Sequence, residues 1–136
     1  MSAHEGKNLP LPTPETQVYW DACKEHRLLI QRCADCNEFQ FYPRPRCTNC
    51  GSLNVNWVDA SGSATLVSFS VISRAVSKAY ADPDSSILAL VKLREGPQMM
   101  SNIVDCDPAD LAIGAALTVV FEDWTEKISI PKFKRV

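Results

Sequence analysis

The chain has 136 residues, 14 basic and 16 acidic side chains, and a formal net charge of −2 with a pI near 5.6. Nucleic-acid binding depends largely on cations that neutralise phosphates, so this charge balance argues against a dedicated nucleic-acid-binding protein. No apolar run reaches the ~18 residues that span a bilayer, and the N-terminus lacks the apolar core of a signal peptide. We therefore expect a cytoplasmic globular protein whose cysteines stay reduced.

Residues 1–13 are predicted to form an extended arm. The run Leu9-Pro10-Leu11-Pro12 places proline at alternate positions and so excludes a helix. With few apolar side chains to bury, the arm is expected to be disordered or to lie across a partner. A helix should follow, with Thr13 as its N-cap and Pro14 at its first position. The helix and a lead-in strand together occupy residues 14–32.

The predicted helix is amphipathic. Val18, Ala22 and His26 recur at helical spacing on one face, with Tyr19 and Cys23 beside them, which indicates about three turns. The apolar residues that follow it, from 28 to 30, begin a short strand that leads into the first cysteine pair.

Two Cys-x-x-Cys pairs, Cys33 with Cys36 and Cys47 with Cys50, are separated by ten residues. Each pair offers two thiolates from one tight turn, and the span between them allows a hairpin that brings the turns together. Four thiolates with no open position predict a structural zinc site within residues 33–58. Two disulfides, four buried thiols, or iron in the same sulfur site are the alternatives.

Residues 59–136 read as a series of short strands. Polar and apolar residues alternate from Thr65 to Val71, which is typical of a strand with one buried face. Ile87–Leu93 is almost continuously apolar and is predicted to be a central strand buried on both faces. The last strand is expected to end before Pro131. Five short strands with one brief helical insertion predict a small closed Greek-key barrel.

Several segments together resemble the DUF35 family, whose members consist of an N-terminal helix, a rubredoxin-like zinc ribbon and an OB-fold. The resemblance runs from about residue 14 to the C-terminus and implies a mainly β protein with a five-stranded OB-fold barrel. The matching residues are Leu28-Leu29-Ile30-Gln31-Arg32-Cys33, Cys36, Pro43-Arg44-Pro45, Cys47, Cys50-Gly51, Gly62-Ser63-Ala64-Thr65, Leu90-Val91-Lys92-Leu93, Ser101-Asn102-Ile103-Val104, Gly114 and Pro131-Lys132-Phe133.

The resemblance implies an accessory role. Its first expectation is a non-catalytic subunit of a thiolase-type acyl-CoA enzyme, in a hetero-oligomer that degrades lipids, steroids or aromatic compounds. This subunit would aid assembly and form part of the acyl-CoA channel, with the CoA thioester as a shared ligand. An accessory subunit of an acyl-CoA hydratase or aldolase is one alternative. A nucleic-acid-binding module is another, because ribbons and OB-folds also serve that purpose.

Cations outside the cysteine motif are candidates for contact with the CoA phosphates, namely Arg74, Lys78, Lys132 and Arg135. The long loop from Arg74 to Ser86 holds Tyr80, an aromatic side chain that a partner could bury. No residues are predicted to be catalytic, because neither histidine lies near Cys106 in the sequence and Cys23 is expected to be a small buried hydrophobe.

Overall fold

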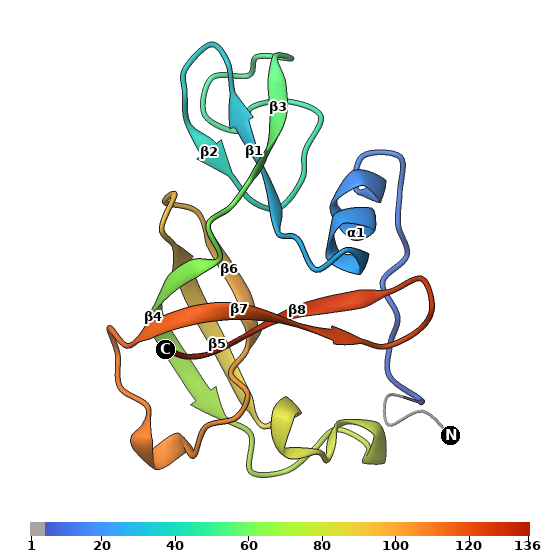
Figure 1. Ribbon diagram of the computed structural model, residues 1–136, viewed down its shortest axis with the longest axis vertical. Helices are drawn as coiled ribbons and strands as arrows, with labels where there is room; N and C mark the ends of the chain where they lie inside the picture. The colour runs from blue at the N-terminus through green and yellow to red at the C-terminus, as the bar shows by residue number, and fades with distance from the viewer. Residues whose placement is uncertain (1–4) are drawn as a thin grey trace.

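The computed structural model describes residues 5–136, in which a small sheet leads directly into a β-barrel and one short α-helix packs beside both (Figure 1). The small sheet has the strand order β2-β1-β3, and the barrel sheet has the order β6-β5-β4-β7-β8; all pairings within both sheets are antiparallel. The element bounds are α1 Gln17–Lys24, β1 Leu29–Cys33, β2 Phe39–Gln40, β3 Val55–Asp59, β4 Ser63–Val71, η1 Lys78–Tyr80, η2 Pro83–Ser85, β5 Ile87–Leu93, β6 Gln98–Asn102, η3 Pro108–Asp110, β7 Ala116–Asp123 and β8 Ser129–Arg135.

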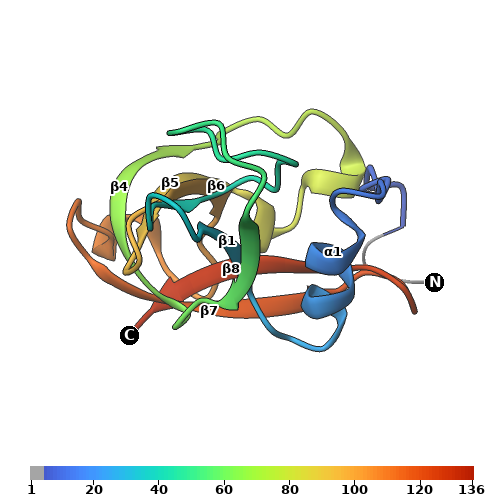
Figure 2. The ribbon, with the colours of Figure 1, turned by 90° about the horizontal axis from the view of Figure 1, so that it is seen from above.

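The five long strands curl until the two ends of their sheet meet, as the view from above shows (Figure 2). Ile103, which follows β6, forms a parallel bridge with Phe133 of β8, and the Val104 amide donates to the Phe133 carbonyl at 2.8 Å. Because this contact is confined to one end of β6, the barrel is nearly closed. The mainly β architecture predicted from the sequence is therefore confirmed.

Helix α1 begins three residues later than predicted, and its buried face agrees with the prediction only in part. The Thr13 carbonyl accepts hydrogen bonds from the amides of Thr16 and Gln17, so the residues before Gln17 form a turn instead of helix. The helix ends at Lys24, and His26 lies beyond it with a left-handed φ of 59°. Of the predicted apolar face, Tyr19, Ala22 and Cys23 are buried as expected, whereas Val18 and His26 are exposed and Trp20 is buried in addition.

One apolar core joins the helix, the lead-in strand and the barrel. Trp20 of α1 and Ile30 of β1 belong to the same cluster of buried side chains as Leu66, Val91 and Phe133 of the barrel. Each large apolar side chain buried in this way stabilises the folded state by about 1.5–3 kcal/mol. The small sheet is consequently anchored to the barrel through α1 and β1.

The N-terminal arm packs on this chain's own barrel. Lys7 is fully buried and its ammonium lies 3.1 Å from the Asp82 carboxylate. The next residue, Asn8, donates its backbone amide to the Tyr80 hydroxyl at 2.7 Å. Disorder was therefore the wrong expectation at Lys7 and Asn8, whereas Leu9 and Leu11 are exposed and their contact with a partner stays a prediction; residues 1–4 lie outside the described part. The sequence pattern missed the packing because its main anchor is a lysine and not an apolar side chain.

Two strands of the barrel depart from the predicted burial. Strand β4 has a bulge between Leu66 and Ser68. Before the bulge the even-numbered residues Ala64 and Leu66 are buried, and after it the odd-numbered Phe69 is the half-buried residue. Strand β5 has the predicted bounds, yet only one of its faces is buried and Leu88 on the other is 38% exposed. The prediction that both faces of β5 are buried is wrong, because in a barrel only the inward-facing side of each strand packs against the core.

Strand β8 continues through Pro131 to Arg135, whereas the prediction ended it before the proline. Pro131 pairs with Phe121 of β7 and lies at the edge of the five-stranded sheet. An edge position tolerates a residue that lacks an amide hydrogen, since only one side of the strand needs a full ladder. The C-terminal segment is thus part of the barrel.

A close approach at the start of β4 gives a first testable prediction. Gly62 has a φ of +85°, and a Cβ atom built there would lie 2.9 Å from Val119 Cγ1. Gly62→Ala should lower the free energy of unfolding by about 2–3 kcal/mol, through the left-handed backbone and the clash together. Gly114→Ala is the control, because its φ of +87° is similar and nothing lies within 4 Å of the added Cβ. Equal losses in urea denaturation of the two variants would contradict the steric part of this account.

Among residues 5–136, no helix combines the length and apolar character required to cross a bilayer.

Candidate metal centre

The four predicted cysteines converge at one end of the small sheet. Their sulfur atoms all lie within 4.8 Å of one another, and the Sγ–Sγ distance is 3.6 Å both for Cys33–Cys50 and for Cys36–Cys47. A tetrahedral zinc ion with Zn–S bonds of about 2.3 Å requires sulfur separations of roughly 3.8 Å. The donor set and its spacing therefore fit a closed tetrahedral metal site.

The two cysteine turns have the same backbone design. In the first, the Asn37 amide donates to the Cys33 carbonyl at 2.9 Å, and in the second the Gly51 amide donates to the Cys47 carbonyl at the same distance. Asn37 and Gly51 both have left-handed backbones, with φ of 64° and 81°. These residue types tolerate that conformation, which closes each turn around its sulfurs.

Backbone amides point at two of the sulfurs and favour the thiolate form. The Cys36 amide donates to Cys33 Sγ at 3.5 Å, and the resulting stabilisation lowers the pKa of Cys33. The Cys50 and Asn49 amides donate to Cys47 Sγ at 3.4 and 3.3 Å, and they lower the pKa of Cys47 to about 6. Thiolates are the form that binds metal, so these amides favour metal binding by Cys33 and Cys47. At Cys50, despite the hydrogen bond from the Ser52 backbone, burial and the three neighbouring thiols raise the pKa to about 12.

A pair of buried glutamines supports the second turn, and sequence reasoning missed both. Gln40 Nε2 donates to Gln31 Oε1 at 2.8 Å, which links β2 to β1. Gln40 Oε1 then accepts from the Thr48 amide at 2.8 Å, and Gln31 Oε1 accepts from the Arg44 amide at 2.9 Å. The two glutamine side chains therefore supply hydrogen bonds to backbone amides in the segment after β2, where the prolines at 43 and 45 interrupt strand pairing. Their only sequence signal is a polar residue at an inward position of each strand.

The remaining cysteines lie away from this centre. Cys23 is fully buried in the common core, and burial raises the pKa of its thiol to about 12, as expected for an inert apolar residue. Cys106 is partly exposed, and its Sγ donates to the Asp107 carbonyl at 3.2 Å. Within residues 5–136, no histidine or carboxylate group forms a hydrogen bond with either thiol.

The four cations predicted to meet CoA phosphates lie on two separate segments of the chain, and their surroundings differ. Arg74 and Lys78 are exposed on the long loop, and Arg135 is exposed at the end of β8. Lys132 is buried, and its ammonium lies 3.0 Å from the Glu122 carboxylate and 3.2 Å from the Asp84 carbonyl. Phosphate binding by the three exposed residues stays a prediction, while the Lys132 ammonium already has internal partners.

The long loop between β4 and β5 contains two short 3-10 helices, η1 and η2. Tyr80 of η1 was predicted to be available to a partner, but its hydroxyl accepts from the arm at Asn8. Lys7 lies 5.8 Å from the Tyr80 ring centroid and 5.3 Å from that of Trp124. Tyr80 therefore fastens the arm to the loop within this chain.

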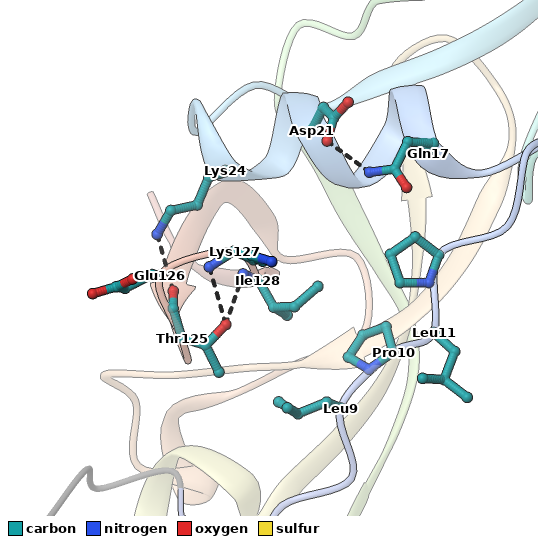
Figure 3. Close-up of a pocket in the computed structure, with 11 residues that line it drawn as sticks. Leu9, Pro10, Leu11, Gln17, Asp21, Lys24, Thr125, Glu126, Lys127 and Ile128 are labelled. Carbon is teal, nitrogen blue, oxygen red and sulfur yellow. Dashed lines mark hydrogen bonds between the residues drawn. The ribbon is translucent and has the colours of Figure 1, made fainter.

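A groove of about 670 Å³ lies between the arm, α1 and the β7–β8 turn (Figure 3). Leu9, Pro10 and Leu11 form its apolar side. Its opposite rim is polar, and there Lys24 donates to the Thr125 carbonyl at 3.0 Å. Because charged side chains of both signs line the rim, this groove indicates no single class of ligand.

His26, Asp123 and Ser129 form a small polar cluster that ties the end of α1 to the β7–β8 hairpin. His26 Nε2 lies 2.8 Å from Asp123 Oδ1, and the buried Ser129 hydroxyl donates to the same oxygen at 2.5 Å. These two partners, Ser129 first, lower the pKa of Asp123. The His26 ring also stacks on Phe121 at a centroid distance of 5.2 Å.

The lowered pKa of Asp123 predicts a pH-dependent contribution to stability. A carboxylate whose pKa is lower in the folded state stabilises above its unfolded pKa, and this contribution is lost as pH falls through the folded value. Asp123→Asn should therefore lower the thermal midpoint at pH 7, with a deficit that shrinks toward pH 3. Glu126→Gln removes an exposed carboxylate from the same hairpin and serves as the control. A deficit that stays constant across this pH range would contradict the prediction.

With the cysteine site and the barrel established, two family models match successive parts of the chain. Residues 20–56 match the rubredoxin-like zinc ribbon domain of ChsH2, and residues 57–122 match the C-terminal OB-fold domain of ChsH2. A DUF35 domain-containing scaffold protein from Methanothermobacter thermautotrophicus is 31% identical over 76% of this chain and 78% of its own length. The chain belongs to the DUF35 family.

Two curated relatives are larger proteins. The 3-oxo-4,17-pregnadiene-20-carboxyl-CoA hydratase alpha subunit of Mycobacterium tuberculosis is 35% identical over 85% of this chain. A probable enoyl-CoA hydratase alpha subunit of Thermomonospora curvata is 31% identical over 92% of it. The matched regions span only 37% and 39% of the lengths of these two hydratase subunits, respectively.

Among solved structures, this chain resembles one from an Ltp2-ChsH2(DUF35) aldolase with a TM-score of 0.82 and 29% sequence identity. The match covers 93% of this chain and 98% of the other, so the DUF35 fold is shared from end to end.

Proposed function

We propose that this chain is a non-catalytic scaffold subunit of an acyl-CoA-processing complex, in which a hydratase or an aldolase supplies the catalytic groups. The observation that carries the proposal is the end-to-end structural match to a chain of the Ltp2-ChsH2(DUF35) aldolase. The match extends over 93% of this chain at 29% sequence identity, which supports a related role, although a shared fold does not by itself determine function.

The comparisons favour the hydratase or aldolase alternative over the thiolase subunit that was the first expectation. Both larger relatives carry the name of a CoA hydratase alpha subunit, and the structural relative is named as an aldolase. One of these names specifies a steroid CoA thioester. We infer that this chain serves the degradation of a steroid or another bulky acyl-CoA.

The side-chain chemistry of residues 5–136 supports a non-catalytic role. A Ser-His-Asp triad requires the histidine between the hydroxyl and the carboxylate, so that the imidazole can accept the hydroxyl proton. Here Asp123 lies between the other two residues, and Ser129 donates to the carboxylate and not to His26. The cluster of Ser129, Asp123 and His26 is thus not an activated nucleophile of this type.

We further propose that the four-cysteine site binds structural zinc. The support is the all-thiolate donor set, the fit of the 3.6 Å sulfur separations, and the absence of an open ligand position in a four-sulfur set. Cys33, Cys36, Cys47 and Cys50 would hold the ion, and its role would be to fix the two turns. Elemental analysis of freshly purified protein should find one zinc per chain. One iron per chain in its place would contradict the assignment of zinc to this site.

We also propose a cytoplasmic location, where the four thiols would stay reduced and able to hold the metal. Contact of Arg74, Lys78 and Arg135 with a CoA thioester, as a ligand shared with the partner, is a further part of the proposal. It predicts that CoA protects these exposed cations from chemical modification only within the assembled complex.

The assembly itself is tested by tagging this chain in its native cell and identifying the proteins that purify with it in a fixed ratio. The expected partner is an acyl-CoA hydratase or aldolase subunit, in a complex that survives gel filtration. The purified chain alone should have no hydratase, aldolase or thiolase activity. Recovery of this chain as a free monomer, with a CoA-dependent activity of its own, would overturn the proposal.

A further inference from the structure

Strand β3 is an outer strand of the small sheet, and only one of its sides is paired. The sheet has the order β2-β1-β3, so β3 bonds to β1 and no other described strand lies on its far side (Figure 1). An unpaired strand side presents a row of backbone N–H and C=O groups that can bond to another chain. This free edge of β3 is therefore a candidate for the addition of a further strand.

The hydrogen bonds between β1 and β3 show which groups face the free edge. Immediately after the strand, the Ala60 amide donates to the Leu28 carbonyl at 2.8 Å. In an antiparallel pair, residues that exchange hydrogen bonds alternate with residues that do not. The even-numbered residues of β3 thus bond to β1, whereas Val55, Trp57 and Asp59 direct their backbone groups outward.

Some of the outward groups have no bond within the described chain. The Val55 amide donates to the Leu53 carbonyl at 3.0 Å and is satisfied in this way. Within residues 5–136, no hydrogen bond reaches the amides of Trp57 and Asp59 or the carbonyl of Trp57. These groups have the spacing of a strand, so an extended chain is the partner that can bond to them in succession.

The free edge lacks the features that usually protect the outer strands of sheets. Strand β3 contains neither Lys nor Pro, and its register with β1 is continuous without a bulge. Its one charged side chain, Asp59, accepts two hydrogen bonds of 3.1 Å from Arg27. By contrast, β2 at the opposite edge is only two residues long and is followed by prolines at 43 and 45. The small sheet is thus protected at one edge and open at the other.

The free edge is held in place at both ends of β3. Val55 pairs with Cys33 of the metal site, and the Asp59 side chain binds Arg27. A binding surface that is already ordered loses little conformational entropy when a partner binds. The four-cysteine site therefore helps to keep this edge ready for another strand.

The size of the edge indicates what kind of chain occupies it. Stable interfaces use about 20–30 residues from each partner, whereas β3 has five. An extended segment on β3 is therefore one part of a larger interface. A second copy of this chain that paired only through β3 would not form a stable dimer, so a segment of the partner enzyme is favoured.

We propose that an extended segment of the partner subunit adds to the free edge of β3 and becomes a fourth strand of the three-stranded small sheet. The inference rests on the proposed function, and it names a contact through which the scaffold holds its partner. The segment bonds to the backbone at Trp57 and Asp59. Opposite the half-buried Trp57 it carries a β-branched or aromatic residue, since such cross-strand pairs stabilise sheets.

Amide hydrogen exchange resolved to single residues tests this contact in the zinc-loaded full chain. The probe is the hydratase or aldolase subunit that purifies with this chain in a fixed ratio. In the complex, the amides of Trp57 and Asp59 should exchange at least about tenfold more slowly than in the free chain. The amides of Asn56 and Val58 bond to β1 in both states and serve as internal controls.

Two substitutions of one residue separate the backbone bond from the side chain. Asp59→Pro removes the outward N–H at an edge position that tolerates proline, whereas Asp59→Asn keeps it. Both variants lose the ion pair with Arg27. Asp59→Pro should weaken the complex about fivefold to tenfold relative to Asp59→Asn, because it removes one hydrogen bond and places a ring against the added strand. Metal content and the thermal midpoint show whether each variant folds, and the exchange measurement on the unchanged chain decides if Asp59→Pro does not.

Unchanged exchange at Trp57 and Asp59, in a complex that forms normally, would overturn the strand addition and leave the scaffold proposal standing. Equal weakening of the complex by the two Asp59 variants would also overturn it. Protection that rises with the concentration of this chain alone would assign the edge to a second copy and contradict the inference. If no complex forms at all, the scaffold proposal fails and this inference fails with it.

Discussion

Cys36→Ser should remove the metal and destabilise more than the small sheet. Structural zinc in peptides is bound with an apparent free energy of about 10–16 kcal/mol, and much of this is coupled to folding. Because Ile30 of the adjoining strand β1 belongs to the same core as the barrel, loss of the site should also loosen α1 against β8. We expect the free energy of unfolding to fall by several kcal/mol in this variant.

The measurement combines metal analysis with urea denaturation monitored by tryptophan fluorescence. Cys106→Ser is the matched control, since Cys106 is a partly exposed thiol outside the four-sulfur cluster. It should retain one metal ion per chain and unfold within about 0.5 kcal/mol of the wild type. Full metal content in the Cys36→Ser protein would contradict the assigned ligand set.

The second large effect is expected at the arm. Lys7→Met removes a fully buried ammonium from Asp82, and breaking a buried pair costs about 3–5 kcal/mol. Because Asp82 is 35% exposed and keeps its bonds from the Ser85 hydroxyl, we expect a smaller loss of about 2–3 kcal/mol. Hydrogen exchange should also accelerate in the loop that contains η1 and η2, since the arm is bonded to it.

Lys78→Met is the control for this prediction. Lys78 is an exposed cation on the same loop, so its removal should change the thermal midpoint very little. If Lys7→Met and Lys78→Met are equally stable, or if removal of residues 1–12 leaves the midpoint unchanged, the arm does not stabilise the barrel.

Local signals explain what could be predicted from the sequence. The metal ligands follow from two short spacings, and each turn is closed by a residue type suited to a left-handed backbone, Asn37 or Gly51. Strand β5 was found with its observed bounds because its apolar run is bounded by Ser86 and by the Glu95–Pro97 turn. These features depend on residues a few positions apart.

The features that could not be predicted depend on residues far apart in the chain. Lys132 reads as a surface cation in sequence, and only the barrel brings it to Glu122 and to the loop at Asp84. The bulge in β4 changes which side chains face inward, and nothing in its alternation marks that change. A groove of about 400 Å³ beside α1 is likewise not predictable from the sequence, because its lining comes from α1, the segment after β2, and strands β5, β6 and β8.

The scaffold role is tested most directly by the activity of the partner enzyme with and without this chain. The hydratase or aldolase subunit that purifies with it would be expressed alone, and its turnover of a bulky acyl-CoA measured as zinc-loaded chain is added. The scaffold account predicts a saturable rise in turnover that ends at a fixed stoichiometry, with no activity in this chain alone. Full activity of the partner without this chain, and no complex on mixing, would contradict the account.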